Sequence, residues 1–151
     1  MTHDLWETIL RMVVAVAAGG LIGWDRQRAG QPAGLRTHML VALGAGLVVS
    51  IPPGGGLAEV SRAVQGVAAG IGFLCAGEIL HLGAQGHERV RGLTSAASLW
   101  VTAAVGMVSS VGSWRFVLIG TIGTLFILIV MRPIELFLCP PPSPAPPDSP
   151  R

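Results

Sequence analysis

Charged residues are scarce in this sequence. Only 12% of its 151 residues are charged and 51% are hydrophobic, whereas an ordinary soluble domain has about a quarter charged residues. So few charges cannot cover a water-facing surface, which argues against a soluble enzyme. Lysine is absent, so all the basic residues are arginines, and the net charge of +2 is too small for a nucleic-acid-binding surface. We therefore expect no nucleic-acid partner.

Cysteine is also scarce, and the usual catalytic motifs are missing. The two cysteines, Cys75 and Cys139, cannot form a disulfide framework or a metal-ligand cluster. We find no phosphate-binding glycine loop and no nucleophile motif. His81 and His87 share one predicted loop, but their spacing does not fit a metal site. The sequence therefore predicts neither enzymatic activity nor a cofactor.

Long apolar runs make up most of the chain, and short polar connections separate them. Each run approaches the roughly 20 residues that a helix needs to cross a bilayer. Acidic residues just before the first run argue against a cleaved signal peptide. We predict an all-α membrane protein, a bundle of five transmembrane helices within residues 1–138. The predicted helices are Leu5–Trp24, Leu35–Ile51, Val60–Leu80, Leu93–Val111 and Trp114–Met131.

The arginines predict how the bundle is oriented, because arginines that flank membrane helices are preferentially retained in the cytoplasm. With five helices, one side has the larger number of arginines, so we expect the N-terminus outside and the C-terminus in the cytoplasm of a bacterial inner membrane. Residues 139–151 are rich in proline and are predicted to be a disordered cytoplasmic tail. The arginine-rich side has Arg26, Arg28, Arg36, Arg89, Arg91, Arg132 and Arg151, and the other side has Arg11, Arg62 and Arg115.

Small residues recur at intervals of four within the predicted helices, and they let helix backbones approach closely in lipid. Two interpretations are open: ordinary helix packing, which we favour, and a weakly polar pathway. Either interpretation predicts a compact bundle or a homo-oligomer. The pairs are Gly19 with Gly23 and Gly66 with Gly70, and the longest series is Thr94, Ser98, Thr102, Gly106 and Ser110.

Polar residues gather at the predicted cytoplasmic ends of the helices. A carboxylate near hydrocarbon is costly unless it is paired, so we expect Asp25 and Glu78 to pair with arginines. The candidate partners are Arg28, Arg36 and Arg91, whereas Arg26, Arg89 and Arg132 are interpreted as interfacial residues that fix topology. The complete candidate cluster is Asp25, Arg28, Arg36, Thr37, Glu78, Arg91, Thr94, Ser95 and Ser98.

Three motifs in order resemble the signatures of the MgtC/SapB family of bacterial membrane proteins. They lie at Pro32–His38, at Gly70–Gly77 and at Val90–Ala104. The resemblance extends from the first predicted helix to Met131. It implies an inner-membrane protein linked to survival in low magnesium and, in some pathogens, to growth inside host cells.

Some positions differ from the family pattern. Asp25 stands where glutamate is more frequent, Cys75 where glycine is usual, and Glu78 where a small or hydroxyl residue is usual. Longer members add a soluble C-terminal domain, and this sequence has the proline-rich tail instead. The resemblance is therefore to a short form of the family.

Two functions remain open at the level of sequence. The first is a regulatory subunit that binds another membrane complex, as the family's inhibition of the proton-translocating ATP synthase implies. The alternative is a transporter of a small ion such as magnesium, or a transport accessory subunit, in which Asp25 and Glu78 would be ion ligands or relays. The sequence does not identify the ion.

Overall fold

The computed structural model describes residues 2–50, 56–83 and 92–138, and these residues form five α-helices. The predicted all-helical fold is confirmed, and every predicted helix has a counterpart. The proline-rich tail at 139–151 lies outside the described residues, so its predicted disorder stays a prediction. The helices are α1 Thr2–Arg28, α2 Leu35–Ser50, α3 Leu57–Gly83, α4 Leu93–Ser110 and α5 Trp114–Leu138.

Four of these helices, α1, α3, α4 and α5, are long and apolar enough to cross a membrane. The fifth, α2, is apolar but has only 16 residues. At about 1.5 Å per residue, such a helix is about 24 Å long, which is less than the roughly 30 Å hydrocarbon core. Hydropathy and length therefore identify four candidate membrane helices. Helix α2 is held in the bundle by its packing against α1 and α4.

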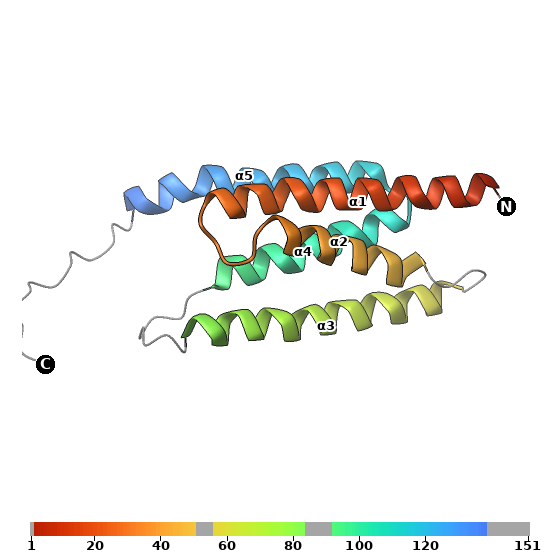
Figure 1. Cartoon of the computed structure of the whole chain (residues 1–151), viewed down its shortest axis with the longest axis horizontal. Coiled ribbons are helices and arrows are strands. Elements are labelled where there is room, and N and C mark those ends of the chain that lie inside the picture. Colours follow the sequence, from red (N-terminus) through yellow and green to blue (C-terminus); the bar gives the residue numbers. More distant parts are fainter. Residues whose placement is uncertain (1, 51–55, 84–91, 139–151) are drawn as a thin grey trace, which may run out of the picture.

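Successive helices run in opposite directions (Figure 1). Consequently α1, α3 and α5 end where α2 and α4 begin, and we call this the Asp25 end. Helix α4 lies at the centre and packs against all four others. Helix α5 lies beside α1, and α3 lies along the opposite edge of the bundle, where it contacts α4 and, to a small extent, α2 (Figure 1).

Glycines let α1, α2 and α4 approach one another closely. A Cβ at Gly19 would lie 2.7 Å from the carbonyl oxygen of His38, and one at Gly23 would lie 2.8 Å from the Cα of Leu35. At Gly106, a Cβ would collide with the backbone of Ala42. The three helices can therefore pack at this distance only because these positions have no side chain.

The series of small residues on α4 faces the interior of the bundle. Ser98, Thr102, Gly106 and Ser110 are buried, and Thr94 at the helix start is exposed. The Ser110 hydroxyl donates to the carbonyl of Gly46 on α2 at 2.7 Å. These contacts favour the packing interpretation of the series over a polar pathway.

Large apolar side chains cover the outside of the bundle. Leu40 is 68% exposed, Phe73 is 84% exposed and Ile119 is 65% exposed. Such a surface is unsuitable for water and suitable for lipid. The exposed side chains therefore agree with the apolar helix lengths in indicating a membrane environment.

Candidate functional site

Asp25 forms an ion pair with the residue that follows it. Arg26 donates from Nε and Nη2 to Oδ2 of Asp25 at 3.1 and 2.5 Å. The Arg26 side chain is only 6% exposed and that of Asp25 is 23% exposed. A guanidinium in this position needs a nearby anion to offset the loss of water, and Asp25 provides it.

This arrangement corrects the sequence prediction for Asp25 and its partners. We expected Arg28, Arg36 or Arg91 beside Asp25, and Arg26 at the interface; Arg91 lies outside the described residues. Instead, Arg28 lies over the ring of Trp24, with its guanidinium carbon 4.8 Å from the ring centroid. Arg36 is exposed and forms no ion pair with a described carboxylate. Arg26 was misassigned because residues adjacent in a helix rarely face each other.

A chain of polar side chains connects the Asp25 end to the centre of the bundle. The Ser95 hydroxyl donates to Oε1 of Gln31 at 3.1 Å, and the Ser98 hydroxyl lies 2.8 Å from the carbonyl oxygen of Ser95. Nε2 of His38 lies 3.1 Å from the same Ser98 oxygen. These contacts link α4 to α2 and to the α1–α2 connection.

His38 is fully buried and is held at both ring nitrogens. Its Nδ1 lies 2.9 Å from the carbonyl oxygen of Gly34, which can only accept, so Nδ1 carries a proton. In a neutral ring, Nε2 must then accept the Ser98 proton. Ser98 has one hydroxyl proton, so it can serve either Nε2 or the carbonyl of Ser95 at a given moment.

Glu78 lies in the last part of α3, away from Asp25 and the polar chain in sequence. Its Oε1 atom is buried and has no hydrogen-bond partner among the described residues. A buried carboxylate oxygen without a donor is costly unless a ligand or a proton satisfies it. Arg91, one of its expected partners, lies outside the described residues.

The structure brings only some of the predicted site residues together. Ser95 and Ser98 belong to the polar chain, whereas Asp25 pairs locally with Arg26. Thr94 and Arg36 are exposed and Thr37 is half-buried, and no hydrogen bond through their side chains is found in the described part of the chain. The described members of the predicted cluster therefore do not form one connected site, and α1 and α3, which carry Asp25 and Glu78, do not contact each other.

Sequence reasoning missed three residues that the structure places at the site: Arg26, Gln31 and His38. His38 did carry a signal, because it stands inside the first family motif and in an otherwise apolar helix. Gln31 had none, since a polar residue in a connection is ordinary. Its importance depends on the turn after α1, where Gly30 has a φ of 68° and Gln31 donates its N–H to the carbonyl of Arg26 at 3.0 Å.

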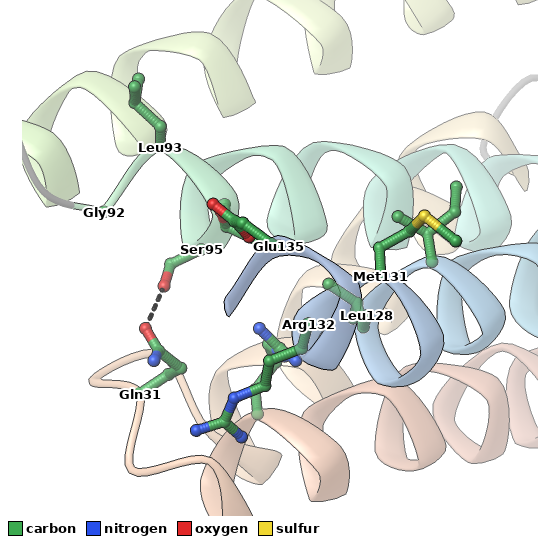
Figure 2. Close-up of a pocket in the computed structure, with 11 residues that line it drawn as sticks. Gln31, Gly92, Leu93, Ser95, Leu128, Met131, Arg132 and Glu135 are labelled. Atoms are coloured by element: carbon green, nitrogen blue, oxygen red, sulfur yellow. Dashed lines mark hydrogen bonds between the residues drawn. The ribbon is translucent and has the colours of Figure 1, made fainter. Parts of the chain in front are cut away.

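A cavity of about 500 Å³ opens at the Asp25 end, between the turn after α1, the start of α4 and the end of α5. Figure 2 shows the Arg132 and Glu135 side chains extending from α5 in different directions, and the hydrogen bond between Gln31 and Ser95. No group of three or more histidine, cysteine or acidic residues that could hold a metal ion occurs among the described residues. The polar lining of the cavity is Arg26, Gln31, Thr94, Ser95, Arg132 and Glu135.

These features define a multi-pass helical membrane protein with a polar cavity at one end. A family model described as the MgtC family matches residues 12–137. The chain therefore belongs to the MgtC family, and the resemblance seen in the three sequence motifs is confirmed.

Several relatives match over most of the chain. Protein SrpB of Synechococcus elongatus is 46% identical over 129 residues, which cover 78% of this chain and 71% of SrpB. "Putative magnesium transporter YhiD" of Escherichia coli K12 is 38% identical over 142 residues, which cover 87% of this chain and 64% of YhiD. Protein MgtC of Salmonella typhimurium is 37% identical over 128 residues, which cover 85% of this chain and 54% of MgtC. No solved structure matches the chain.

Proposed function

We propose that this protein regulates another membrane protein during adaptation to low magnesium, and that the groove between α2 and α3 receives a transmembrane helix of that partner. In this proposal all five helices lie within a bacterial inner membrane, with the N-terminus outside and the C-terminus in the cytoplasm. The family resemblance and the names of the relatives support the link to magnesium. The exposed glycines of α3 support the mode of action.

The observation that carries the proposal is the open glycine face of α3. Gly66, Gly70 and Gly77 lie on the same side of the helix, and a Cβ added at any of them would meet nothing within 4 Å. At the glycines of α1 and α4 described above, atoms of neighbouring helices instead occupy the space that a side chain would need. Small residues in a membrane helix allow close helix contacts. Helix α3 therefore has a surface suited to close helix contacts, and no helix among the described residues packs against it.

A groove lies beside this face. It has a volume of about 520 Å³ and runs between α2 and α3. Gly44 and Ala45 contribute to it from α2, and Val67, Gly70 and Leu74 from α3. Its walls are almost entirely apolar, so the occupant is an apolar helix, and Arg36 at one end offers a charge to a polar headgroup or an acidic residue.

The proposal is tested by placing bulk in the groove. Gly70→Ile should abolish growth support in low magnesium. It should also remove the crosslinks between the partner and a photoreactive residue placed on α3. Gly123→Ile on α5 is the matched control, since a Cβ there also meets nothing within 4 Å. Both variants are compared at equal amounts in the membrane. Full activity of Gly70→Ile would contradict the proposal, and crosslinks between copies alone would replace the partner by a homo-oligomer.

Ion transport is the second candidate, and Glu78 is the observation that favours it. An unpaired buried carboxylate oxygen can bind a cation or carry a proton, and one relative is named a putative magnesium transporter. Purified protein in liposomes, assayed for magnesium flux and proton leak, separates the two functions. Flux that Glu78→Gln abolishes supports transport, and absence of flux in folded protein argues against it.

A further inference from the structure

The lining of the cavity at the Asp25 end contains two guanidinium groups and one carboxylate, and Asp25, which is not part of the lining, pairs with one of the guanidinium groups. Arg26 and Arg132 contribute two guanidinium groups, and Glu135 contributes one carboxylate. Neither the regulatory nor the transport function uses this cavity, which lies away from the α2–α3 groove. Its lining therefore calls for a separate explanation.

Arg26 brings an unused donor to the cavity. Its side chain is more than nine-tenths buried, and Nε and Nη2 are engaged with Asp25. Nη1 has no acceptor within residues 2–50, 56–83 and 92–138. A guanidinium nitrogen that is accessible from the cavity and has no acceptor among the described residues favours an anionic ligand that can complete its hydrogen bonds.

Arg132 on α5 supplies a second positive charge to the lining of the cavity. It forms no salt bridge in the described ranges, not even with Glu135 one turn later on α5. Figure 2 shows the Arg132 side chain extending on the cavity side of α5. Two guanidinium groups from different helices thus border one space.

The beginning of α4 adds backbone donors to the same space. Gly92 precedes the helix with a φ of 90°, and no side chain caps it. The N–H groups of Leu93, Thr94 and Ser95 therefore have no partner within the helix, and these residues line the cavity. The positive end of an 18-residue helix dipole attracts an anion at this position.

The remaining wall of the cavity is apolar. Leu93, Ile127, Leu128 and Met131 lie beside the polar groups. A lining that is half polar and half apolar fits a ligand with an anionic head and a hydrocarbon body.

We propose that this cavity binds a phosphate group, and that its source is the headgroup of an anionic phospholipid. Arg26 and Arg132 would contact the phosphate oxygens together with the free N–H groups of α4. Glu135 limits the attraction, because its carboxylate repels the same phosphate.

Native mass spectrometry of the purified full chain in detergent tests the site. Phosphatidylglycerol is compared with phosphatidylcholine of the same acyl chains, and the anionic lipid should bind more tightly. Arg132→Gln should weaken phosphatidylglycerol binding about five-fold, since one arginine near a membrane surface contributes about that factor. Glu135→Gln should strengthen it. Arg132 is exposed, so its replacement does not threaten folding.

Arg115→Gln is the matched control. Arg115 is also exposed, but it lies at the start of α5 with its guanidinium carbon 5.7 Å from the Trp114 ring centroid. Equal losses in Arg115→Gln and Arg132→Gln, or no preference for the anionic lipid, would overturn the lipid site. A third outcome is that inorganic phosphate raises the thermal stability of the protein, that Arg132→Gln removes this effect, and that no lipid is preferred. This result would support an anion site whose ligand is free phosphate. Absence of both effects overturns the proposal entirely.

Discussion

Arg26 is buried, which distinguishes it from the other arginines that the structure describes. Because Arg26 is buried, its charge depends on the ion pair with Asp25. That pair uses Nε and Nη2, so Nη1 remains available to a ligand in the cavity. Arg62 and Glu59 form a comparable ion pair at 2.9 Å on the surface of α3, with both side chains well exposed. The two pairs allow a buried and an exposed ion pair to be compared within one protein.

Replacement of Asp25 should destabilise the fold strongly. Asp25→Asn removes the counter-ion of Arg26, and an uncompensated buried charge costs about 3 kcal/mol, near the lower end of the usual range because Asp25 is partly exposed. Glu59→Gln should change the free energy of unfolding by less than about 1 kcal/mol, as expected for a surface pair. Denaturation in mixed detergent micelles measures both. Similar values for the two variants would contradict the structural role of the Asp25–Arg26 pair.

Ser98→Ala should also destabilise the fold, for a different reason. It leaves Nε2 of the buried His38 without its partner, which costs about 1 to 3 kcal/mol. Ser61→Ala is the control, since Ser61 is exposed and only accepts a hydrogen bond from Gln65. The same denaturation assay applies, and a Ser98→Ala variant as stable as Ser61→Ala would show that His38 does not depend on this contact.

The sequence indicated some residues of the candidate site but not their contacts. The sequence placed polar residues at one end of the bundle because charges flank membrane helices. It could not indicate that Arg26 turns inward to Asp25, since that contact depends on how α1 packs against its neighbours. His38 was passed over because a lone histidine has no distinctive spacing, and only the close approach of α2 to α4 brings it to Ser98.

At the scale of helices, the apolar runs predicted which helices form and in what order, but they predicted the lengths of the helices less well. Helix α4 begins at Leu93 as predicted and ends one residue earlier. Helices α1 and α5 extend beyond their apolar runs, to Arg28 and Leu138. Hydropathy reports where a helix can lie in lipid, and it does not detect turns that continue into the polar region. Pro133 lies within the added part of α5 without ending the helix.

Helix packing predicts opposite effects of the same substitution at two glycines. Gly106→Ala places a methyl group against the backbone of Ala42, and overpacking of this kind costs about 1 to 3 kcal/mol. Gly66→Ala adds a methyl group in open space and should leave stability unchanged or slightly raised. Thermal unfolding in detergent compares them, and equal destabilisation would show that α3 is packed more tightly than the structure describes.

At the scale of the whole molecule, the arginine bias leads to a topology prediction. In a background with Cys75→Ala and Cys139→Ser, Val111→Cys should react with a membrane-impermeant maleimide from outside. Pro32→Cys should react only after the membrane is permeabilised, because the arginine-rich connections are retained in the cytoplasm. Both positions are exposed and lie at opposite ends of the bundle. The reverse pattern of labelling would invert the proposed orientation.

The position of α3 at the edge of the bundle constrains the order in which the chain is assembled. Helix α3 is synthesised between α2 and α4, yet α2 and α4 pack directly on each other through Ala42 and Gly106. A newly inserted α3 must therefore leave the α2 surface free until α4 arrives. The apolar, open face of α3 allows this helix to remain surrounded by lipid before α4 is inserted. The serines and threonines of α4 are inserted later, when α1 and α2 already provide hydrogen-bond partners.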